Sequence, residues 1–283
     1  MTSIQAFIGF SQHDAAPVAA GETAVPGYPD NRVMPLLSTI EDAREKPAIS
    51  LDEEGFTLAR HVTAFTAERD LEVLRRGYHD EMADFLTDYL DASLVVPARA
   101  GILVRDGRRL MGRTKFDGDP DVIDDRIPAS FAHVDYLLPD AIAAQAKLEC
   151  SFEGHEDIPH RRMVILQTWR SISPPPQDIP LALCDCRTVA ESDLSPRTGV
   201  LAPQNRNGLP SASFIVGGVH HNPQQRWFYY PSMTPDEVIL LTGFDTARPA
   251  RGRVAHAAFD NRANEPDAKP RESIEARFYV YYD

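Results

Sequence analysis

Two histidines and an aspartate have the types and the spacing of a metal site. His133 and Asp135 are two residues apart, and alternate residues of a strand project from one face, so both side chains would point the same way. His256 is the lone histidine of another apolar segment, Arg253–Phe259. Two histidines and a carboxylate form the facial triad of non-haem Fe(II) oxygenases, which leaves positions open for a co-substrate and O2. The pattern predicts these three residues as iron ligands, although H-x-D alone is equally compatible with a hydrogen-bonded pair in a core.

Arg271 and Ser273 form a second pair that alternation would place on one face, at the start of the C-terminal apolar segment. A guanidinium fork and a hydroxyl can hold the distal carboxylate of a dicarboxylic co-substrate, whose keto-acid end could then chelate iron. The alternative is a surface arginine paired with Glu272 or Glu275. H-x-D, a distant histidine and R-x-S in this order are far more specific together than any one of them, so the pattern favours a keto diacid bound beside the metal.

The remaining histidines and the cysteines carry weaker signals. The segment Gly154–His160 contains a second H-x-D, but it lies in a charged stretch between Gly and Pro, which is typical of a solvated loop. His79 falls in a helical segment, where a surface or packing role is expected. His220 and His221 cannot both face one way on a strand, so at most one could line a pocket. Cys184-Asp185-Cys186 has no second cysteine pair, so buried free thiols are favoured over a zinc site.

Trp169, Arg170 and Tyr230 are the candidates for the wall of a substrate or co-substrate pocket, although aromatic residues in such segments more often belong to the core. Arg170 follows an apolar run, and a buried guanidinium needs a partner. Asp185 and a bound anion are equally open as that partner. Further pocket residues are expected from the N-terminal segment and from the loop Arg105–Ile127.

The elements that must position these residues are mostly short strands. Apolar residues recur at three- and four-residue steps from Thr66 to Leu90, which predicts one amphipathic helix starting near Thr66. A second, shorter helix is predicted at Pro139–Leu148. A turn at Glu54-Gly55 precedes a short strand within Leu51–His61. The other expected strands are Ser93–Val96, Gly101–Val104, Met163–Ile172, Ala212–Val219, Arg226–Tyr230, Val238–Leu241, Arg253–Phe259 and Ser273–Tyr282.

Many of these strands follow one another too closely for crossover helices, so a parallel sheet is disfavoured. We expect a mainly β fold with helices, built as a β-sandwich or jelly roll with helical decoration in the N-terminal third. The chain should form one domain over residues 1–283. In that domain, residues 1–60 would be an extended wrap, because residues 11–50 show no clean periodicity; residues 66–91 would be a long supporting helix and residues 93–283 the core.

Composition excludes several classes of function. The chain has 283 residues and a formal net charge of −13, and no basic run offsets that charge locally, which argues against a nucleic-acid partner. Three cysteines are too few for a disulfide framework. The N-terminus lacks the features of a secretory signal and no stretch is long and apolar enough to cross a membrane, so we expect a reduced, cytoplasmic protein without a membrane partner.

Seven motifs occur in order along nearly the whole chain. They are LDEEGFTLARH (51–61), HVDY (133–136), QTWRSI (167–172), PLALCDCRTV (180–189), RWFYYPSMTPDEVILLTGFDT (226–246), VAHAAFDN (254–261) and PRESIEARFYVYY (270–282). With these motifs the chain resembles Fe(II)/2-oxoglutarate-dependent oxygenases, specifically the hydroxylase/desaturase family of microbial secondary metabolism related to cephem methoxylase subunits and gibberellin desaturases. It departs from that family at Gln167, where the family often has Asn in N-x-W-R-P, and at His220-His221.

The resemblance implies a double-stranded β-helix (jelly-roll) core and the cofactors Fe(II), 2-oxoglutarate and O2. It implies His133, Asp135 and His256 as iron ligands and Arg271 with Ser273 as the 2-oxoglutarate clamp. The implied reaction is oxidation of a small secondary metabolite by hydroxylation, desaturation or cyclisation, with release of succinate and CO2. An iron oxidase or isomerase without 2-oxoglutarate and a catalytically silent partner subunit are the alternatives. The sequence leaves a homodimer open and does not select one substrate.

Overall fold

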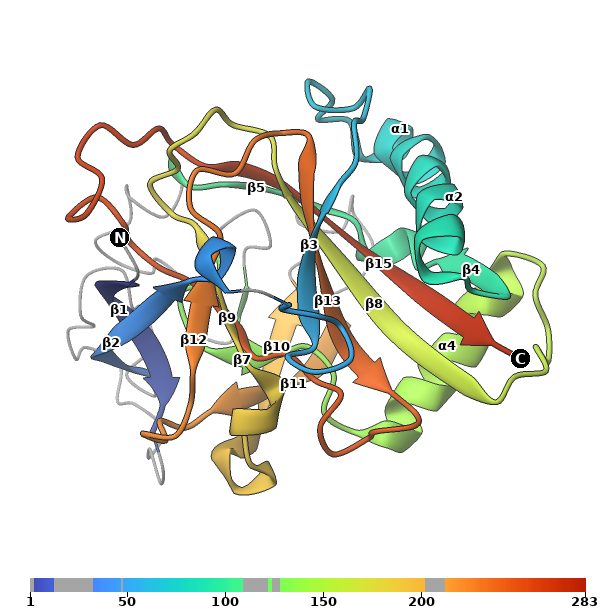
Figure 1. Cartoon of the computed structure of the whole chain (residues 1–283). Helices are drawn as coiled ribbons and strands as arrows, with labels where there is room; N and C mark the ends of the chain where they lie inside the picture. Colours follow the sequence, from blue (N-terminus) through green and yellow to red (C-terminus); the bar gives the residue numbers. More distant parts are fainter. Residues whose placement is uncertain (1–2, 13–32, 47, 109–121, 124–127, 202–211) are drawn as a thin grey trace.

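The computed structural model covers residues 1–283 and describes all of them except 1–2, 13–32, 47, 109–121, 124–127 and 202–211. The described part consists of two β-sheets with α-helices packed beside them (Figure 1). Most neighbouring strands are antiparallel, and the parallel pairs are β10 with β6 and β12 with β2. This agrees with the expectation that the chain does not form a parallel sheet with crossover helices.

The larger sheet has nine strands and contains the segments that carry the predicted metal ligands. In sheet order, its strands are β1 (Ser3–Ser11), β2 (Val33–Asp42), β12 (Trp227–Tyr229), β9 (Leu181–Cys184), β14 (His256–Ala258), β7 (His133–Val134), β11 (Ala212–Val219), β10 (Leu194–Leu201) and β6 (Val122–Ile123). The short strands β7 and β14 lie side by side in the middle of this order.

The second sheet has six strands and contains the segment with the predicted co-substrate clamp. In order, its strands are β3 (Phe56–Arg60), β13 (Glu237–Asp245), β8 (Arg162–Ser171), β15 (Glu272–Tyr282) and β4 (Leu94–Pro97), with β5 (Leu103–Asp106) also paired to β15. Side chains of the two sheets pack together in a shared apolar cluster, to which β8 and β13 contribute Trp169 and Leu241 and β9 contributes Leu183. Two sheets curled around a common interior confirm the predicted jelly-roll class.

Helices cover the outer face and one end of the six-stranded sheet. The alternate residues Ile274, Phe278 and Val280 of β15 pack outward against α1 (Leu71–Arg76) and α2 (Tyr78–Leu90). Figure 1 shows these two helices beside β4 and β15, on the side of the molecule away from β1 and β2. Helix α4 (Pro139–Phe152) packs against another cluster that includes Tyr279 and Tyr281. Within the described residues no helix combines the length and apolar character needed to span a bilayer.

The predicted long helix is two helices that begin later than expected. Asp70, not Thr66, caps the start, because its side chain accepts hydrogen bonds from the backbone N–H groups of Glu72 and Val73. The two helices meet at Gly77, where a Cβ atom would lie 2.3 Å from the ring of Phe65. The ring of Phe65 therefore occupies the space that a side chain at residue 77 would need, and only glycine fits there. The second predicted helix is confirmed and is longer by one turn.

The N-terminal segment, expected to be an extended wrap over residues 1–60, contains the strands β1 and β2. β1 pairs with β2 along its full length, and β2 also pairs with β12, so both belong to the nine-stranded sheet. The alternate residues Ile4, Ala6, Ile8 and Phe10 are buried, a two-residue period that indicates a strand. Strands β9 and β10 were also not predicted. Residues 13–32 of the expected wrap lie outside the described part.

His79 provides a test of how α2 packs on β15. Its ring is fully buried, with its centroid 5.4 Å from that of Phe278, and burial together with the charges of Arg99 and Arg75 lowers its pKa to about 3. A histidine in an unfolded chain has a pKa of about 6.5. As the pH falls below about 6.5 the unfolded chain therefore takes up a proton that the native chain does not, and stability decreases until about pH 3.

We predict that His79→Leu reduces the loss of stability between pH 7 and pH 5 by about 2 kcal/mol. Urea denaturation at several pH values measures this difference. His160→Leu, at an exposed position, is the matched control and should keep the wild-type pH dependence. Equal acid sensitivity of His79→Leu and wild type would contradict the proposed neutral, buried state of His79.

Candidate metal and co-substrate site

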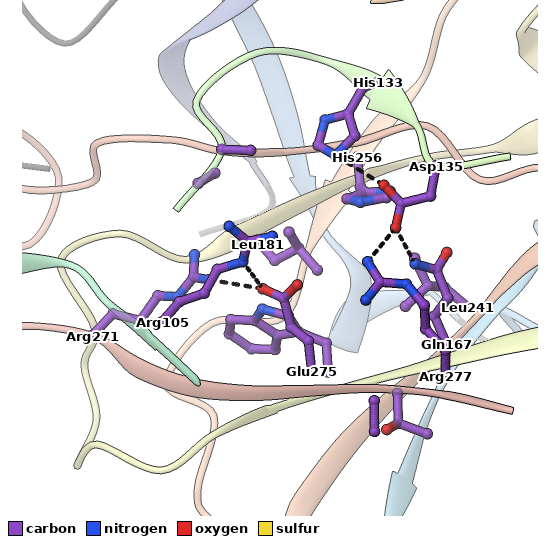
Figure 2. A pocket seen from close by; sticks show the side chains of 15 residues that line it. Arg105, His133, Asp135, Gln167, Leu181, Leu241, His256, Arg271, Glu275 and Arg277 are labelled. Carbon is purple, nitrogen blue, oxygen red and sulfur yellow. Dashed lines mark hydrogen bonds and ion pairs between the residues drawn. The ribbon is translucent and has the colours of Figure 1, made fainter. Parts of the chain in front are cut away.

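His133, Asp135 and His256 converge although they come from distant parts of the chain. His133 of β7 and His256 of β14 are direct partners in the antiparallel pairing, and their ring centroids are 4.4 Å apart. Asp135 follows β7, and its Oδ1 lies 3.3 Å from Nε2 of His133. One ligand atom from each of the three residues lies within 4.8 Å of the others (Figure 2). Strand pairing therefore brings the three predicted ligands to one point.

The backbone orients both histidines. Nδ1 of His133 lies 2.8 Å from the carbonyl oxygen of Phe131, and Nδ1 of His256 lies 3.1 Å from that of Val254. A carbonyl oxygen only accepts, so each Nδ1 carries a proton, and Nε2 is the ring nitrogen left for a metal. Burial and the neighbouring His133 lower the pKa of His256 to about 4, which keeps its imidazole neutral near pH 7. Neutral imidazoles with a fixed tautomer are the form that binds a metal.

Side chains from the six-stranded sheet fix the orientation of Asp135. Nη2 of Arg277 and Nε2 of Gln167 both donate to Oδ2 of Asp135, each at 2.6 Å. Arg277 and Gln167 are direct partners in the β15–β8 pairing. Burial works against the charge of Asp135, but the positive charge of Arg277 more than offsets it and holds the pKa of Asp135 well below the usual range. The carboxylate is thus ionised, with one oxygen anchored and the other beside His133.

Arg271 and Ser273 form a buried pair elsewhere in the same pocket. The side chain of Arg271 is 1% exposed, and it donates from Nε and Nη2 to Oγ of Ser273 and from Nη1 to the carbonyl of Ile179. Its guanidinium also lies over the ring of Trp169, with 4.9 Å from Cζ to the centroid. Burial lowers its pKa to about 10, so it stays protonated at neutral pH. The burial of its side chain excludes the alternative that Arg271 is a surface arginine.

Glu275 and Arg105 complete the charged lining, and the sequence did not mark either of them as a functional residue. Oε1 of Glu275 accepts from Nε of Arg105 at 2.6 Å and lies 3.5 Å from Nη2 of Arg271. The sequence suggested Glu275 only as a surface partner of Arg271, and Arg105 only as the start of a pocket loop. Arg277 was also missed. Alternation from Arg271 through residues 273, 275 and 277 is the signal that identifies two of the three, because it places them on one strand face.

One pocket connects the two groups of residues. Its described lining includes His133, Asp135 and His256 at one part and Arg271 and Glu275 at another. Figure 2 shows the histidines and Asp135 facing Arg277 and Gln167, with Arg271 and Arg105 both directed at Glu275. A metal site and a buried cation with hydrogen-bonding capacity for a carboxylate therefore share one cavity between the sheets.

Of the three residues expected in the pocket wall, Trp169 is part of the described lining. Arg170 is not, because adjacent strand residues point to opposite faces. Its guanidinium is fully buried beneath the helices, where it donates to the carbonyls of His61 and Pro235 and to Nδ1 of His61. Asp185 is therefore not its partner. Tyr230 belongs to an apolar cluster in which its ring centroid is 6.3 Å from that of Phe56. It is not part of the described pocket lining.

The histidine and cysteine motifs outside this pocket make packing or surface contacts. The second H-x-D lies in an exposed turn, where Asp157 pairs with Lys147. His220 is buried with Nδ1 2.8 Å from the carbonyl of Ser11, while the ring of His221 packs edge-on against Phe10. All three cysteines are free and buried, as expected. Within the described residues the only group of three or more metal-ligating side chains is the one at His133.

The donor set fits ferrous iron. Two imidazole nitrogens and one carboxylate oxygen form the two-histidine, one-carboxylate set that binds non-haem Fe(II) and leaves other coordination positions open. The hydrogen bonds that Nδ1 of both histidines donates, and the one that Oδ2 of Asp135 accepts from Arg277, are the supporting contacts that such a site needs.

The chain is similar in sequence to known proteins. Residues 11–281 match the family model YDMC, described as "Oxidoreductase/YMDC permease-like domain". The hydroxylase/desaturase efuI of Hormonema carpetanum is 32% identical over 242 residues, which cover 83% of this chain and 79% of that protein. The Fe(II)/2-oxoglutarate-dependent dioxygenase nvfI of Aspergillus novofumigatus is 31% identical over 154 residues, 54% of this chain and 52% of that protein.

The fold has a solved counterpart. The iron and alpha-ketoglutarate-dependent endoperoxidase NvfI superposes with a TM-score of 0.73 at 22% identity, covering 99% of this chain and 98% of that one. At this identity the match supports the fold, while the family follows from the domain model and from the relative at 32% identity. The chain belongs to the hydroxylase/desaturase family of Fe(II)/2-oxoglutarate-dependent oxygenases.

Proposed function

We propose that His133, Asp135 and His256 hold the ferrous ion of this oxygenase, and that Arg271 and Ser273 bind the distal carboxylate of 2-oxoglutarate. The observation that carries the proposal is the convergence of the three ligand atoms within 4.8 Å, in a pocket that also contains the buried guanidinium of Arg271. When bound, iron with 2-oxoglutarate and O2 supplies the oxidation of a C–H bond, with release of succinate and CO2.

The chain's own residues position these groups. Fixed tautomers present both histidines through Nε2, and Arg277 with Gln167 leaves only Oδ1 of Asp135 directed toward the histidines. Oγ of Ser273 accepts hydrogen bonds from Nε and Nη2 of Arg271. These bonds fix the orientation of the guanidinium over the ring of Trp169. Because all of these contacts are made within the protein, the site is preorganised for its ligands.

The substrate is proposed to be a small secondary metabolite that undergoes hydroxylation, desaturation or cyclisation. Support comes from curated relatives named for hydroxylase/desaturase activity and from a relative named for aspirochlorine biosynthesis. The proposal includes a cytoplasmic enzyme that acts without nucleic acid or a membrane. A homodimer is left open, and light scattering of the purified chain measures that state directly.

We predict that His133→Ala and His256→Ala each lose stoichiometric Fe(II) and succinate formation, while His160→Ala at an exposed position retains both. Arg271→Met should weaken 2-oxoglutarate binding by about 10- to 100-fold, because charge-assisted hydrogen bonds to the co-substrate are lost. Metal analysis of anaerobically purified protein and chromatographic assay of succinate measure these effects. Full succinate formation by His256→Ala would remove the metal assignment. Wild-type turnover that does not depend on added 2-oxoglutarate, and that Arg271→Met leaves unchanged, would favour an oxidase or isomerase without 2-oxoglutarate.

The Arg277–Asp135 contact generates a separate prediction about metal binding. Without Arg277 the burial of Asp135 is no longer offset, so its pKa should rise, and a protonated carboxyl group competes with the metal. We predict that Arg277→Met binds Fe(II) about 10- to 100-fold more weakly than wild type at pH 6 and approaches wild type at pH 8.

Anaerobic calorimetric titration with Fe(II) between pH 6 and pH 8 measures this difference. Arg277→Lys, which keeps a positive charge beside the carboxylate, should show a smaller pH effect. Parallel pH curves for wild type and Arg277→Met would show that Arg277 does not control the charge of Asp135. A melting curve for each variant separates a metal effect from a loss of folding, since Arg277 also donates to the carbonyl of Gly101.

A further inference from the structure

Glu275 is a second carboxylate in the pocket, and the roles proposed above do not account for it. Its side chain is 17% exposed and lines the same cavity as Arg271. A negative charge at this place opposes the binding of a keto diacid, which carries two negative charges of its own. Its presence therefore needs a physical explanation within the site.

Two arginines compete for one oxygen of Glu275. Oε1 accepts a hydrogen bond from Nε of Arg105 at 2.6 Å, whereas Nη2 of Arg271 is 3.5 Å from the same atom, beyond the usual 2.7–2.9 Å of a charged hydrogen bond. In Figure 2 a dashed line runs from each arginine to this carboxylate. Glu275 is thus held by Arg105 and only approached by Arg271.

Strand pairing sets this arrangement. Ser273 of β15 is the direct partner of Arg105 of β5, so Arg105 lies across from the clamp and diagonal to Glu275. Arg271 directly precedes β15, and alternation places it on the same face as Ser273 and Glu275; Arg271 and Glu275 line the pocket. Arg105 can therefore hold the carboxylate of Glu275 from β5.

A small movement of Glu275 would block the clamp. Arg271 already donates N–H groups to Ser273 and to the carbonyl of Ile179, so few donors remain for a ligand carboxylate. If Glu275 moved closer to Arg271 by less than about 1 Å, it would form a full charged hydrogen bond and occupy one of these donors. The co-substrate would then have to displace a buried ion pair before it could bind.

We propose that Arg105 is a positioning residue that holds Glu275 off Arg271 and so keeps the 2-oxoglutarate clamp open. The inference rests on the proposed role of Arg271 and adds a residue that acts on the co-substrate only through Glu275. Glu275 in turn supplies the negative charge that the buried Arg271 and the half-buried Arg105 need when the co-substrate is absent.

The test is the dissociation constant of 2-oxoglutarate for the Mn(II)-loaded protein, measured by anaerobic calorimetry for wild type and four variants. Arg105→Met should raise this constant about tenfold or more, because Glu275 then pairs with Arg271. Glu275→Gln should bind as tightly as wild type or more tightly. The double variant Arg105→Met/Glu275→Gln should return to within about threefold of Glu275→Gln, since no carboxylate remains to block Arg271.

The fourth variant controls for charge alone. Arg108→Met removes a positive charge from the same segment, where Arg108 pairs with Asp106 and Glu272 and not with Glu275. It should leave the dissociation constant near that of wild type. In turnover with Fe(II), Arg105→Met should raise KM for 2-oxoglutarate while kcat at saturating 2-oxoglutarate changes little. Arg105→Gln takes the place of Arg105→Met if the latter melts below the assay temperature.

Two results would overturn the inference. A double variant as weak as Arg105→Met would show that Arg105 contacts the co-substrate directly, and an unchanged constant for Arg105→Met would show that Glu275 does not compete. Either result leaves the proposed function standing if Arg271→Met still loses 2-oxoglutarate. A wild-type protein that does not bind 2-oxoglutarate would overturn both the inference and the proposed function.

Discussion

The contact of Asp135 with Arg277 and Gln167 is the interaction on which the rest of the pocket depends. Asp135 follows β7 of the nine-stranded sheet, whereas Arg277 and Gln167 belong to β15 and β8 of the six-stranded sheet, so the contact joins the two sheets. A charge buried without a partner costs several kcal/mol, and here each charge is satisfied by the opposite sheet. The spacing of the sheets and the orientation of the carboxylate beside His133 are therefore fixed together.

Strand β15 serves the pocket with one face and the hydrophobic core with the other. Its pocket face carries Glu275 and Arg277, with Arg271 just before its first residue, and its outer face packs Ile274 and Phe278 under the helices. A chain with a net charge of −13 thus has a pocket in which three guanidinium groups face two carboxylates. The local excess of positive charge attracts an anion that the protein as a whole would repel. Packing of α1 and α2 on the outer face holds these charges at fixed positions.

Much of the candidate site could be predicted because alternation in a strand is a strong local rule. From the sequence alone it places His133 with Asp135, and Arg271 with Ser273, on common faces. The same rule excludes Trp169 and Arg170 from sharing one wall, so the prediction of both as wall residues was inconsistent with it. The contribution of Arg105 depends on the β5–β15 pairing, a contact between residues 170 positions apart that no local pattern specifies. Strand β2 was missed because its burial does not alternate cleanly.

The two buried arginines on neighbouring strands show why burial alone does not identify a binding residue. Arg170 is surrounded by neutral acceptors at hydrogen-bonding distance, which are the carbonyls of His61 and Pro235, a ring nitrogen and the hydroxyl of Tyr78. Its donors are committed to the fold. Arg271 instead has one carbonyl, one hydroxyl and a carboxylate still 3.5 Å away, in a cavity. An ionised donor in a pocket forms its strongest hydrogen bonds with a charged acceptor. An arginine that lacks such an acceptor at hydrogen-bonding distance is therefore the group to which an incoming carboxylate binds.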